Sequence, residues 1–202
     1  MLKNISGPER ANVLTHFPGM VFGVIGMGLF ASLSAHWSVM VFSAGFLLMF
    51  STSTIYHYLT DTELKTKLRI ADHISIYVLI AATYTPFIML FMNTSKGQWI
   101  LGILWSCVLV GSVLKVFFTG RFRVVSTIIY LIMGWMAIFA INDFLRFIPQ
   151  NILLLIGLGG IFYTLGTIFY IWKSKPYNHA IWHLFVLGGA VSHWVAVWLS
   201  VS

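Results

Sequence analysis

Long uncharged apolar runs alternate with short polar segments along almost the whole chain. A helix needs about 20 apolar residues to cross a hydrocarbon core of roughly 30 Å. Runs of about this length predict transmembrane helices at residues 17–34, 39–59, 70–92, 99–118, 124–141, 152–172 and 181–201. Helices are expected rather than strands, because the runs lack the alternation of apolar and polar positions that a barrel requires. The pattern therefore predicts an all-α, polytopic membrane protein in which residues 1–202 form a single seven-transmembrane-helix domain.

The composition excludes a soluble domain and argues against a nucleic-acid partner. Of the 202 residues, 59% are hydrophobic and only 8% are charged, whereas soluble domains carry about 25% charged residues. The formal net charge of +7 comes from basic residues in short segments between apolar runs, and not from one basic element that could read a groove. Membrane lipids, especially those of an anionic leaflet, are therefore the expected partners.

Basic residues are distributed unevenly between the two sides of the predicted bundle. If successive runs cross the membrane, ten basic residues fall on the side of the N-terminus: Lys3, Arg10, Lys65, Lys67, Arg69, Lys115, Arg121, Arg123, Lys173 and Lys175. Only Lys96 and Arg146 fall on the other side. Because short cytoplasmic loops carry an excess of Lys and Arg, the N-terminus is predicted to be cytoplasmic and the C-terminus external.

Ionisable residues gather at one end of the predicted bundle. His57 lies at the end of the second run, and Asp72 and His73 lie near the start of the third. His179 and His183 lie at the entrance to the seventh. Because the helices cross alternately, all five positions share the side of the membrane on which most basic residues fall. Ionisable residues within a span are costly and are therefore functional candidates.

The spacing of three of these histidines favours a metal site. His179 and His183 are four residues apart, so on a helix they share a face and are separated by about 6 Å along its axis. His57 would complete a three-histidine site with an open fourth position, which is the pattern of catalytic zinc sites. Zn²⁺ is therefore the predicted cofactor. Asp72 is a candidate catalytic base for a water in the open position, and Ser53, one turn before His57, is a candidate hydrogen-bonding residue beside it.

The remaining histidines are expected to have structural roles. His73 is expected to pack or to lie at the interface, and it is the first substitute if His57 does not bind the metal. His193 follows His183 by ten residues and so lies about 15 Å further along the helix. We therefore expect His193 to form an interhelical hydrogen bond. His16 and His36 lie at the ends of predicted spans, where an interfacial position is expected.

Several short motifs of this sequence occur together in a known family of membrane proteins. They follow one another over nearly the whole chain: Glu9-Arg10-Ala11-Asn12 to Thr15-His16, Ser53-x-x-x-His57, Asp72-His73 with Ile76-Tyr77, Tyr84-Thr85-Pro86, and Asn178-His179 through Trp182-His183-Leu184-Phe185 to His193. On these motifs the sequence resembles the hemolysin III branch of the progestin and adipoQ receptor family. Through that branch it resembles the wider group that contains adiponectin receptors and alkaline ceramidases.

The resemblance implies a seven-helix fold with an internal N-terminus and a zinc ion near the cytoplasmic surface. The family's three zinc ligands match His57, His179 and His183. Its acidic residue near the metal's water matches Asp72, and its helix-2 serine matches Ser53. For the better-studied relatives, the resemblance further implies hydrolysis of lipid amides such as ceramide. The short chain looks like the bacterial members, which implies a bacterial inner membrane as its location.

Three functions are compatible with these observations. A zinc-dependent intramembrane hydrolase of a lipid amide or ester bond is favoured, with the substrate entering sideways from the bilayer between helices. The alternative is a membrane sensor or receptor in which the zinc is structural. A pore-forming haemolysin is less favoured, because near-continuous apolar spans are typical of a resident membrane protein.

Overall fold

The computed structural model describes residues 5–33, 35–172 and 174–202. Two of the basic residues counted above, Lys3 and Lys173, lie outside these ranges. The elements in chain order are α1 (Gly7–Ser32), α2 (Trp37–Tyr58), α3 (Thr62–Phe91), α4 (Ser95–Phe118), α5 (Arg123–Gly134), the 3₁₀ helix η2 (Met136–Ala140), α6 (Ile141–Phe147), α7 (Gln150–Ile171) and α8 (Asn178–Leu199).

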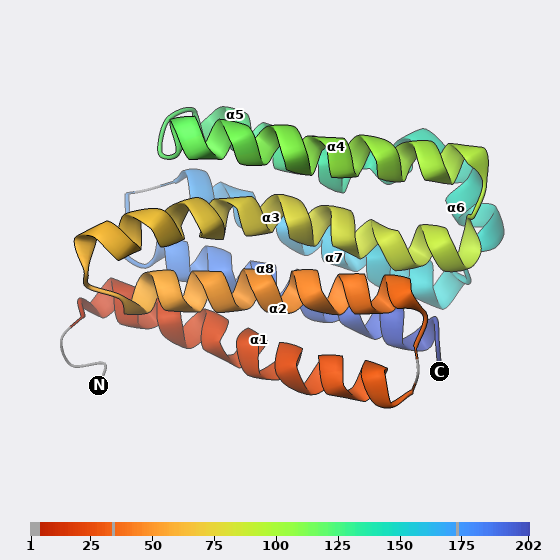
Figure 1. The fold of residues 1–202 in the computed structure, drawn as a ribbon, viewed down its shortest axis with the longest axis horizontal. Helices are drawn as coiled ribbons and strands as arrows, with labels where there is room; N and C mark the ends of the chain where they lie inside the picture. Colours follow the sequence, from red (N-terminus) through yellow and green to blue (C-terminus); the bar gives the residue numbers. More distant parts are fainter. Residues whose placement is uncertain (1–4, 34, 173) are drawn as a thin grey trace.

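The fold is helical, as the apolar runs predict. With α5, η2 and α6 taken together as Arg123–Phe147, the described ranges contain seven helices that are long and apolar enough to cross a membrane. The start of α1 and the end of α8 lie at opposite ends of the bundle (Figure 1). This is the arrangement that an odd number of crossings requires.

Helix α1 begins at Gly7, well before the apolar run that starts at Phe17. The side chain of Ser6 accepts a hydrogen bond from the backbone N–H of Glu9, and Pro8 occupies the first turn. Both features are typical of a helix start, and the acidic Glu9 also suits the positive end of the helix dipole. His16 consequently lies within the helix and is buried. The expectation that His16 is interfacial was therefore wrong.

The fifth span is interrupted where the apolar run predicts one continuous helix. Between α5 and α6 the chain forms η2, and the hydroxyl of Tyr84 from α3 reaches this break. The hydroxyl donates to the carbonyl of Gly134 at 2.6 Å and accepts from the N–H of Ala137 at 3.0 Å. A hydroxyl from a neighbouring helix thus satisfies two backbone groups that the interrupted helix leaves free, as a span in lipid requires.

The helices form a ring that closes through the first and last of them. Helices α1, α2 and α3 pack side by side in chain order, α5 contacts both α3 and α7, α7 packs on α8, and α8 returns to α1. Helix α4 packs on the outer side of α3 (Figure 1). The start of α1, the end of α2, the start of α3 and the start of α8 all lie at the end of the bundle where the chain begins. The fold therefore brings the predicted site residues to one end.

Candidate metal centre

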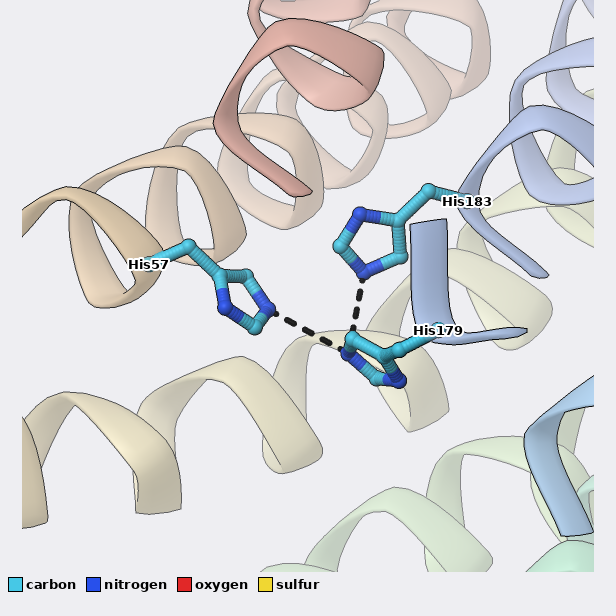
Figure 2. Close-up of side chains that lie close together, drawn as sticks. All are labelled: His57, His179 and His183. Atoms are coloured by element: carbon cyan, nitrogen blue, oxygen red, sulfur yellow. Dashed lines mark hydrogen bonds between the residues drawn. The ribbon is translucent and has the colours of Figure 1, made fainter. Parts of the chain in front are cut away.

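The imidazoles of His57, His179 and His183 meet between α2 and α8. Nε2 of His179 lies 3.3 Å from Nε2 of His57 and 3.1 Å from Nε2 of His183, as Figure 2 shows. One ligand atom of each residue lies within 4.8 Å of the other two. His57 and His183 are only 3% and 2% exposed, whereas His179 is half-buried. The predicted convergence of these three histidines is confirmed.

The spacing of the three nitrogens fits a single metal ion. An ion coordinated tetrahedrally by imidazoles, with bonds of about 2.0–2.1 Å, holds its ligand nitrogens about 3.3 Å apart. The two Nε2–Nε2 distances from His179 are 3.3 and 3.1 Å. These three side chains could therefore hold a metal ion without large rearrangement.

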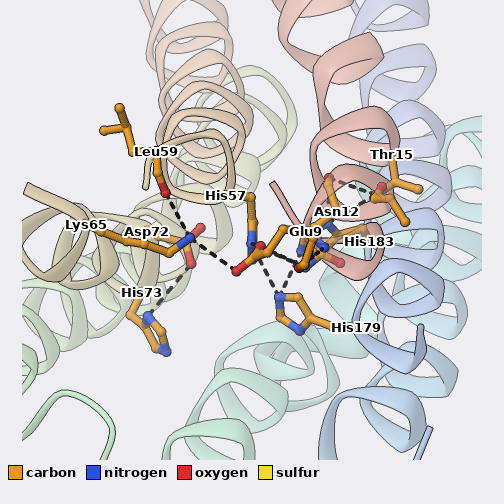
Figure 3. Close-up of polar contacts among 12 residues, drawn as sticks. Glu9, Asn12, Thr15, His57, Leu59, Lys65, Asp72, His73, His179 and His183 are labelled. Carbon is orange, nitrogen blue, oxygen red and sulfur yellow. Dashed lines mark hydrogen bonds and ion pairs between the residues drawn. The ribbon is translucent and has the colours of Figure 1, made fainter. Parts of the chain in front are cut away.

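Helix α1 fixes the orientation of His57 through Glu9. The Nδ1 of His57 lies 2.6 Å from Oε2 of Glu9, and the other oxygen of this carboxylate accepts from Lys65 at 3.2 Å (Figure 3). Asn12 adds a third contact, since its amide lies 3.3 Å from Oε2 of Glu9. Because a carboxylate only accepts hydrogen bonds, Nδ1 of His57 must carry the proton. In the neutral ring, the lone pair of Nε2 then points toward the other two imidazoles.

Helix α1 also fixes the orientation of His183. Its Nδ1 lies 3.2 Å from the backbone carbonyl of Asn12 and 3.2 Å from the hydroxyl of Thr15. His16 stacks on the His183 ring with the centroids 3.6 Å apart. Since the carbonyl can only accept, Nδ1 of His183 is the donor and its Nε2 is an acceptor.

Two acceptor nitrogens therefore face one nitrogen of His179. A proton on Nε2 of His179 could form a hydrogen bond to His57 or to His183, and the lone pair of the remaining ring would have no donor. A cation at the centre would satisfy all three lone pairs together. Metal-ligating histidines ordinarily donate their second nitrogen to a carboxylate or a carbonyl, and His57 and His183 do so here. The donor set therefore fits a metal.

Asp72, Ser53 and His73 lie near this centre without joining it. Asp72 and Ser53 line the same cavity as the three histidines, and Asp72 is not a member of the metal-ligand group. His73 donates from Nδ1 to the carbonyl of Arg69 at 2.6 Å, and this nitrogen lies 3.8 Å from Asp72. The group that could hold a metal thus contains His57, and His73 is not needed as its substitute.

The hydrogen bonds from α1 to the histidines are the part of the site that the sequence pattern did not predict. Glu9, Asn12 and His16 follow one another at three- and four-residue intervals, which places them on one face of a helix. This spacing is the signal that could have identified the face. Hydropathy does not reveal this face, because the polar segment precedes the first apolar run and lies outside the span that hydropathy predicts.

A cavity of about 560 Å³ extends from the three histidines into the bundle. Polar side chains such as Glu9, Asn12 and Ser53 line it near the histidines. Further in, its wall includes apolar residues of five helices: Leu79, Phe87, Ile138, Phe144, Leu153 and Val186. Its volume is in the range of small-molecule sites. The candidate metal centre thus lies at one end of a cavity that continues into the apolar core.

The helices and this centre define a multi-pass integral membrane protein with a buried three-histidine group that could hold a metal ion. The family model described as "Haemolysin-III related" matches residues 7–194. The chain therefore belongs to the haemolysin-III-related family, within the progestin and adipoQ receptor group, as its motifs indicated.

Named relatives agree with this assignment. The chain is 42% identical over 196 residues to "Hemolysin-3 homolog" of Bacillus subtilis (strain 168), which covers 94% of this chain and 92% of the relative. It is 36% identical over 189 residues to "Hemolysin-3" of Bacillus cereus, covering 90% and 86%. It is also 28% identical over 202 residues to "Monocyte to macrophage differentiation factor" of Homo sapiens, covering 94% and 83%. Relatives of this chain thus occur in both bacteria and humans.

Proposed function

We propose that this protein is a zinc-dependent hydrolase that cleaves an amide or ester bond of a lipid within the membrane. The observation that carries the proposal is the convergence of three Nε2 atoms at one end of a cavity that continues into the apolar core. Three protein ligands leave a fourth position for water, as in catalytic zinc sites, whereas structural sites usually have four protein ligands. Imidazole nitrogen is a usual ligand of zinc, and the absence of cysteine among these three residues disfavours metals that require thiolates.

His57, His179 and His183 would hold the ion. When bound, zinc would act as a Lewis acid toward the substrate carbonyl and would make an adjacent water more acidic. Asp72 would take a proton from the attacking water and deliver it to the leaving nitrogen or oxygen. The oxygen of this water adds to the carbonyl carbon, and the carbon–nitrogen or carbon–oxygen bond breaks. Ser53 would donate a hydrogen bond to the substrate carbonyl.

The cavity is suited to the apolar part of such a substrate. Residues such as Phe87 and Val186 would contact an acyl chain and exclude water from it. The lipid would enter sideways from the bilayer, so that its chains never leave an apolar environment. The uneven distribution of basic residues supports a cytoplasmic position for the metal end, and the bacterial relatives support a location in a bacterial inner membrane.

The test separates a catalytic metal from a structural one. Purified protein would be assayed against N-acyl and O-acyl lipids, and its bound metal measured by mass spectrometry. Asp72→Asn is expected to retain about one zinc per chain and to lose at least about 100-fold in turnover, the usual contribution of a general base. Asp143→Asn is the matched control, because this carboxylate pairs with Lys96 at 3.1 Å and does not line the cavity.

Two results would contradict the proposal. Turnover that survives in Asp72→Asn would remove this residue from the mechanism. Retention of zinc by a wild-type protein that hydrolyses no acyl lipid would favour the sensor or receptor with a structural metal. Lipid composition of native membranes, compared between wild type and Asp72→Asn, would identify the accumulating substrate.

A further inference from the structure

Four basic side chains line the cavity at the metal end of the bundle. Arg69 comes from α3, Lys115 from the last turn of α4, and Arg121 and Arg123 from the turn into α5. This turn lies at the same end of the bundle as the N-terminus (Figure 1). Arg69 and Arg121 are exposed, so the cavity has a basic opening here.

Lys115 is the most unusual member of this group, because it is buried. Lys115 is only 4% exposed, and its Nζ donates a hydrogen bond to the hydroxyl of Ser126 at 2.6 Å. Nζ also lies 5.9 Å from the centre of the Tyr130 ring. An ammonium has three donors, and a buried lysine is ordinarily paired with an acidic group. Among the described residues, Lys115 has a hydroxyl and an aromatic ring beside it and forms no ion pair with a carboxylate.

Four of the five carboxylate side chains are engaged elsewhere, and the fifth, Asp72, lines the same cavity as the four cations. Glu9 pairs with His57 and Lys65, Glu63 with Lys67 and Asp143 with Lys96, Asp61 caps the start of α3, and Asp72 lies 3.8 Å from His73. Within the residues that the structure describes, none of the four cavity cations forms an ion pair. One carboxylate, that of Asp72, cannot balance four cations, so a net positive charge is left for a ligand to neutralise.

Arg123 links the basic opening to the metal centre. Its guanidinium carbon lies 4.0 Å from the centre of the Tyr170 ring, and this ring lies 6.1 Å from that of His179. Nε of Arg123 is buried and has no hydrogen-bond partner among the described residues. The Tyr170 ring therefore lies beside both the guanidinium of Arg123 and the predicted zinc ligand His179.

The backbone of the turn makes room for Arg69. Gly120 has a φ of +85°, a conformation that side chains rarely adopt. A Cβ at this position would also lie 2.7 Å from Nη2 of Arg69. The turn therefore depends on glycine for its conformation, whereas the flexible Arg69 side chain could shift to make room for a Cβ.

We propose that Lys115, Arg69, Arg121 and Arg123 form a subsite for the phosphate group of a lipid whose chain occupies the apolar part of the cavity. Arginine forks match phosphate oxygens, and several cations from different directions suit a group with several charged oxygens. A free phosphate would leave the apolar part of the cavity unused. General attraction to an anionic leaflet does not account for Lys115, because that effect acts on exposed basic residues.

This subsite would make a phosphate the head group of the lipid in the proposed function. The inference rests on the proposed function only where it calls that lipid a substrate. The test therefore uses ether-linked lipids, which contain no bond that the proposed hydrolase could cleave. Calorimetric titration in a neutral maltoside detergent would compare hexadecyl-glycerol phosphate with hexadecyl-glycerol. The phosphate-bearing lipid is expected to bind at least about tenfold more tightly, as one charge-assisted hydrogen bond suffices to produce.

Variants locate the effect. Lys115→Gln and Arg121→Gln should each reduce the preference for the phosphate-bearing lipid, and Lys115→Arg should retain it. Arg121 is exposed, so its variant tests the subsite even if the change at buried Lys115 impairs folding. Lys67→Gln is the matched control, since Lys67 pairs with Glu63 at 2.7 Å and does not line the cavity.

Two results would overturn the subsite. The first is equal affinity for the charged and the neutral lipid, or a preference that survives both glutamine variants. The second is displacement of the phosphate-bearing lipid by inorganic phosphate at matching concentrations, which would identify a site for the free anion. Neither result depends on turnover, so the hydrolase proposal would be unaffected by the loss of the subsite.

Discussion

His183 and His193 lie on the same helix, both are buried, and both line the same cavity. Each ring uses one nitrogen in a hydrogen bond to a backbone carbonyl, at 3.2 Å to Asn12 from His183 and at 3.1 Å to Ile156 from His193. The second nitrogen of His183 faces His179, whereas that of His193 has no hydrogen-bond partner among the described residues. On this helix, a buried histidine is thus a candidate metal ligand where other ligand nitrogens converge on its free lone pair.

The largest effect is expected when the converging nitrogens are removed. A protein with both His179→Ala and His183→Ala should fall from about one bound zinc per chain to a negligible amount, because a single imidazole remains. Loss of a ligand that binds only the folded state should also lower the thermal stability of the purified protein. Metal analysis and thermal unfolding would measure the two effects. Unchanged metal content would remove the site.

The variant His193→Gln tests whether His193, on the same helix as His183, has any part in binding the metal. The glutamine amide can still donate toward the carbonyl of Ile156 in α7, so the interhelical hydrogen bond predicted from the sequence, and confirmed by the structure, would be retained. This variant is expected to bind as much zinc as the wild type. A loss of metal in His193→Gln would show that the contrast between the two histidines is wrong.

A smaller effect is expected at the carboxylate that holds His57. Glu9→Gln keeps the shape of the side chain but replaces the charged acceptor of the hydrogen bond from Nδ1. Zinc affinity should fall by about 10- to 100-fold, the usual cost of losing a group that orients a metal ligand. Competition with a chelator of known affinity would measure this change. Glu63→Gln, at an exposed ion pair on α3, is the control and should leave the affinity unchanged.

The span positions and the histidine cluster could be predicted because both follow from the order and spacing of residues along the sequence. A run of apolar residues must reach a minimum length to cross a bilayer, so its approximate position is readable. Once the number of crossings is known, the side of the membrane follows for His57, His179 and His183. A four-residue spacing then places two imidazoles on one helix face.

The remaining features depend on contacts between distant segments. The start of α1 could not be located from hydropathy, because Ser6 caps the helix and Glu9 and Asn12 in its first turns are also polar. The break after Gly134 depends on a hydroxyl from α3, and no apolar pattern reports such a contact. Glu9 pairs with His57 only when α1 has one particular orientation about its own axis. Packing of α1 against α2 and α8 sets that orientation.

The smallest effect contrasts two tyrosines that line the cavity, one whose hydroxyl has hydrogen-bond partners and one whose hydroxyl has none among the described residues. The hydroxyl of Tyr84 joins the carbonyl of Gly134 to the N–H of Ala137 across the helix break, whereas the hydroxyl of Tyr163 has no partner among the described residues. Tyr84→Phe should lower the free energy of unfolding by about 1–2 kcal/mol, because two buried backbone groups lose their partner. Tyr163→Phe should change it by less than about 0.5 kcal/mol.

Unfolding of both variants by titration with SDS, followed by circular dichroism, would measure this difference, and metal content should be unchanged in both. Equal stability of the two variants would mean that the backbone groups at the break find other partners when the Tyr84 hydroxyl is removed. The break would then be a property of residues 134–137 themselves. A larger loss in Tyr84→Phe would instead show that an interrupted span is maintained by a donor and acceptor from its neighbour, because lipid offers the freed groups no alternative.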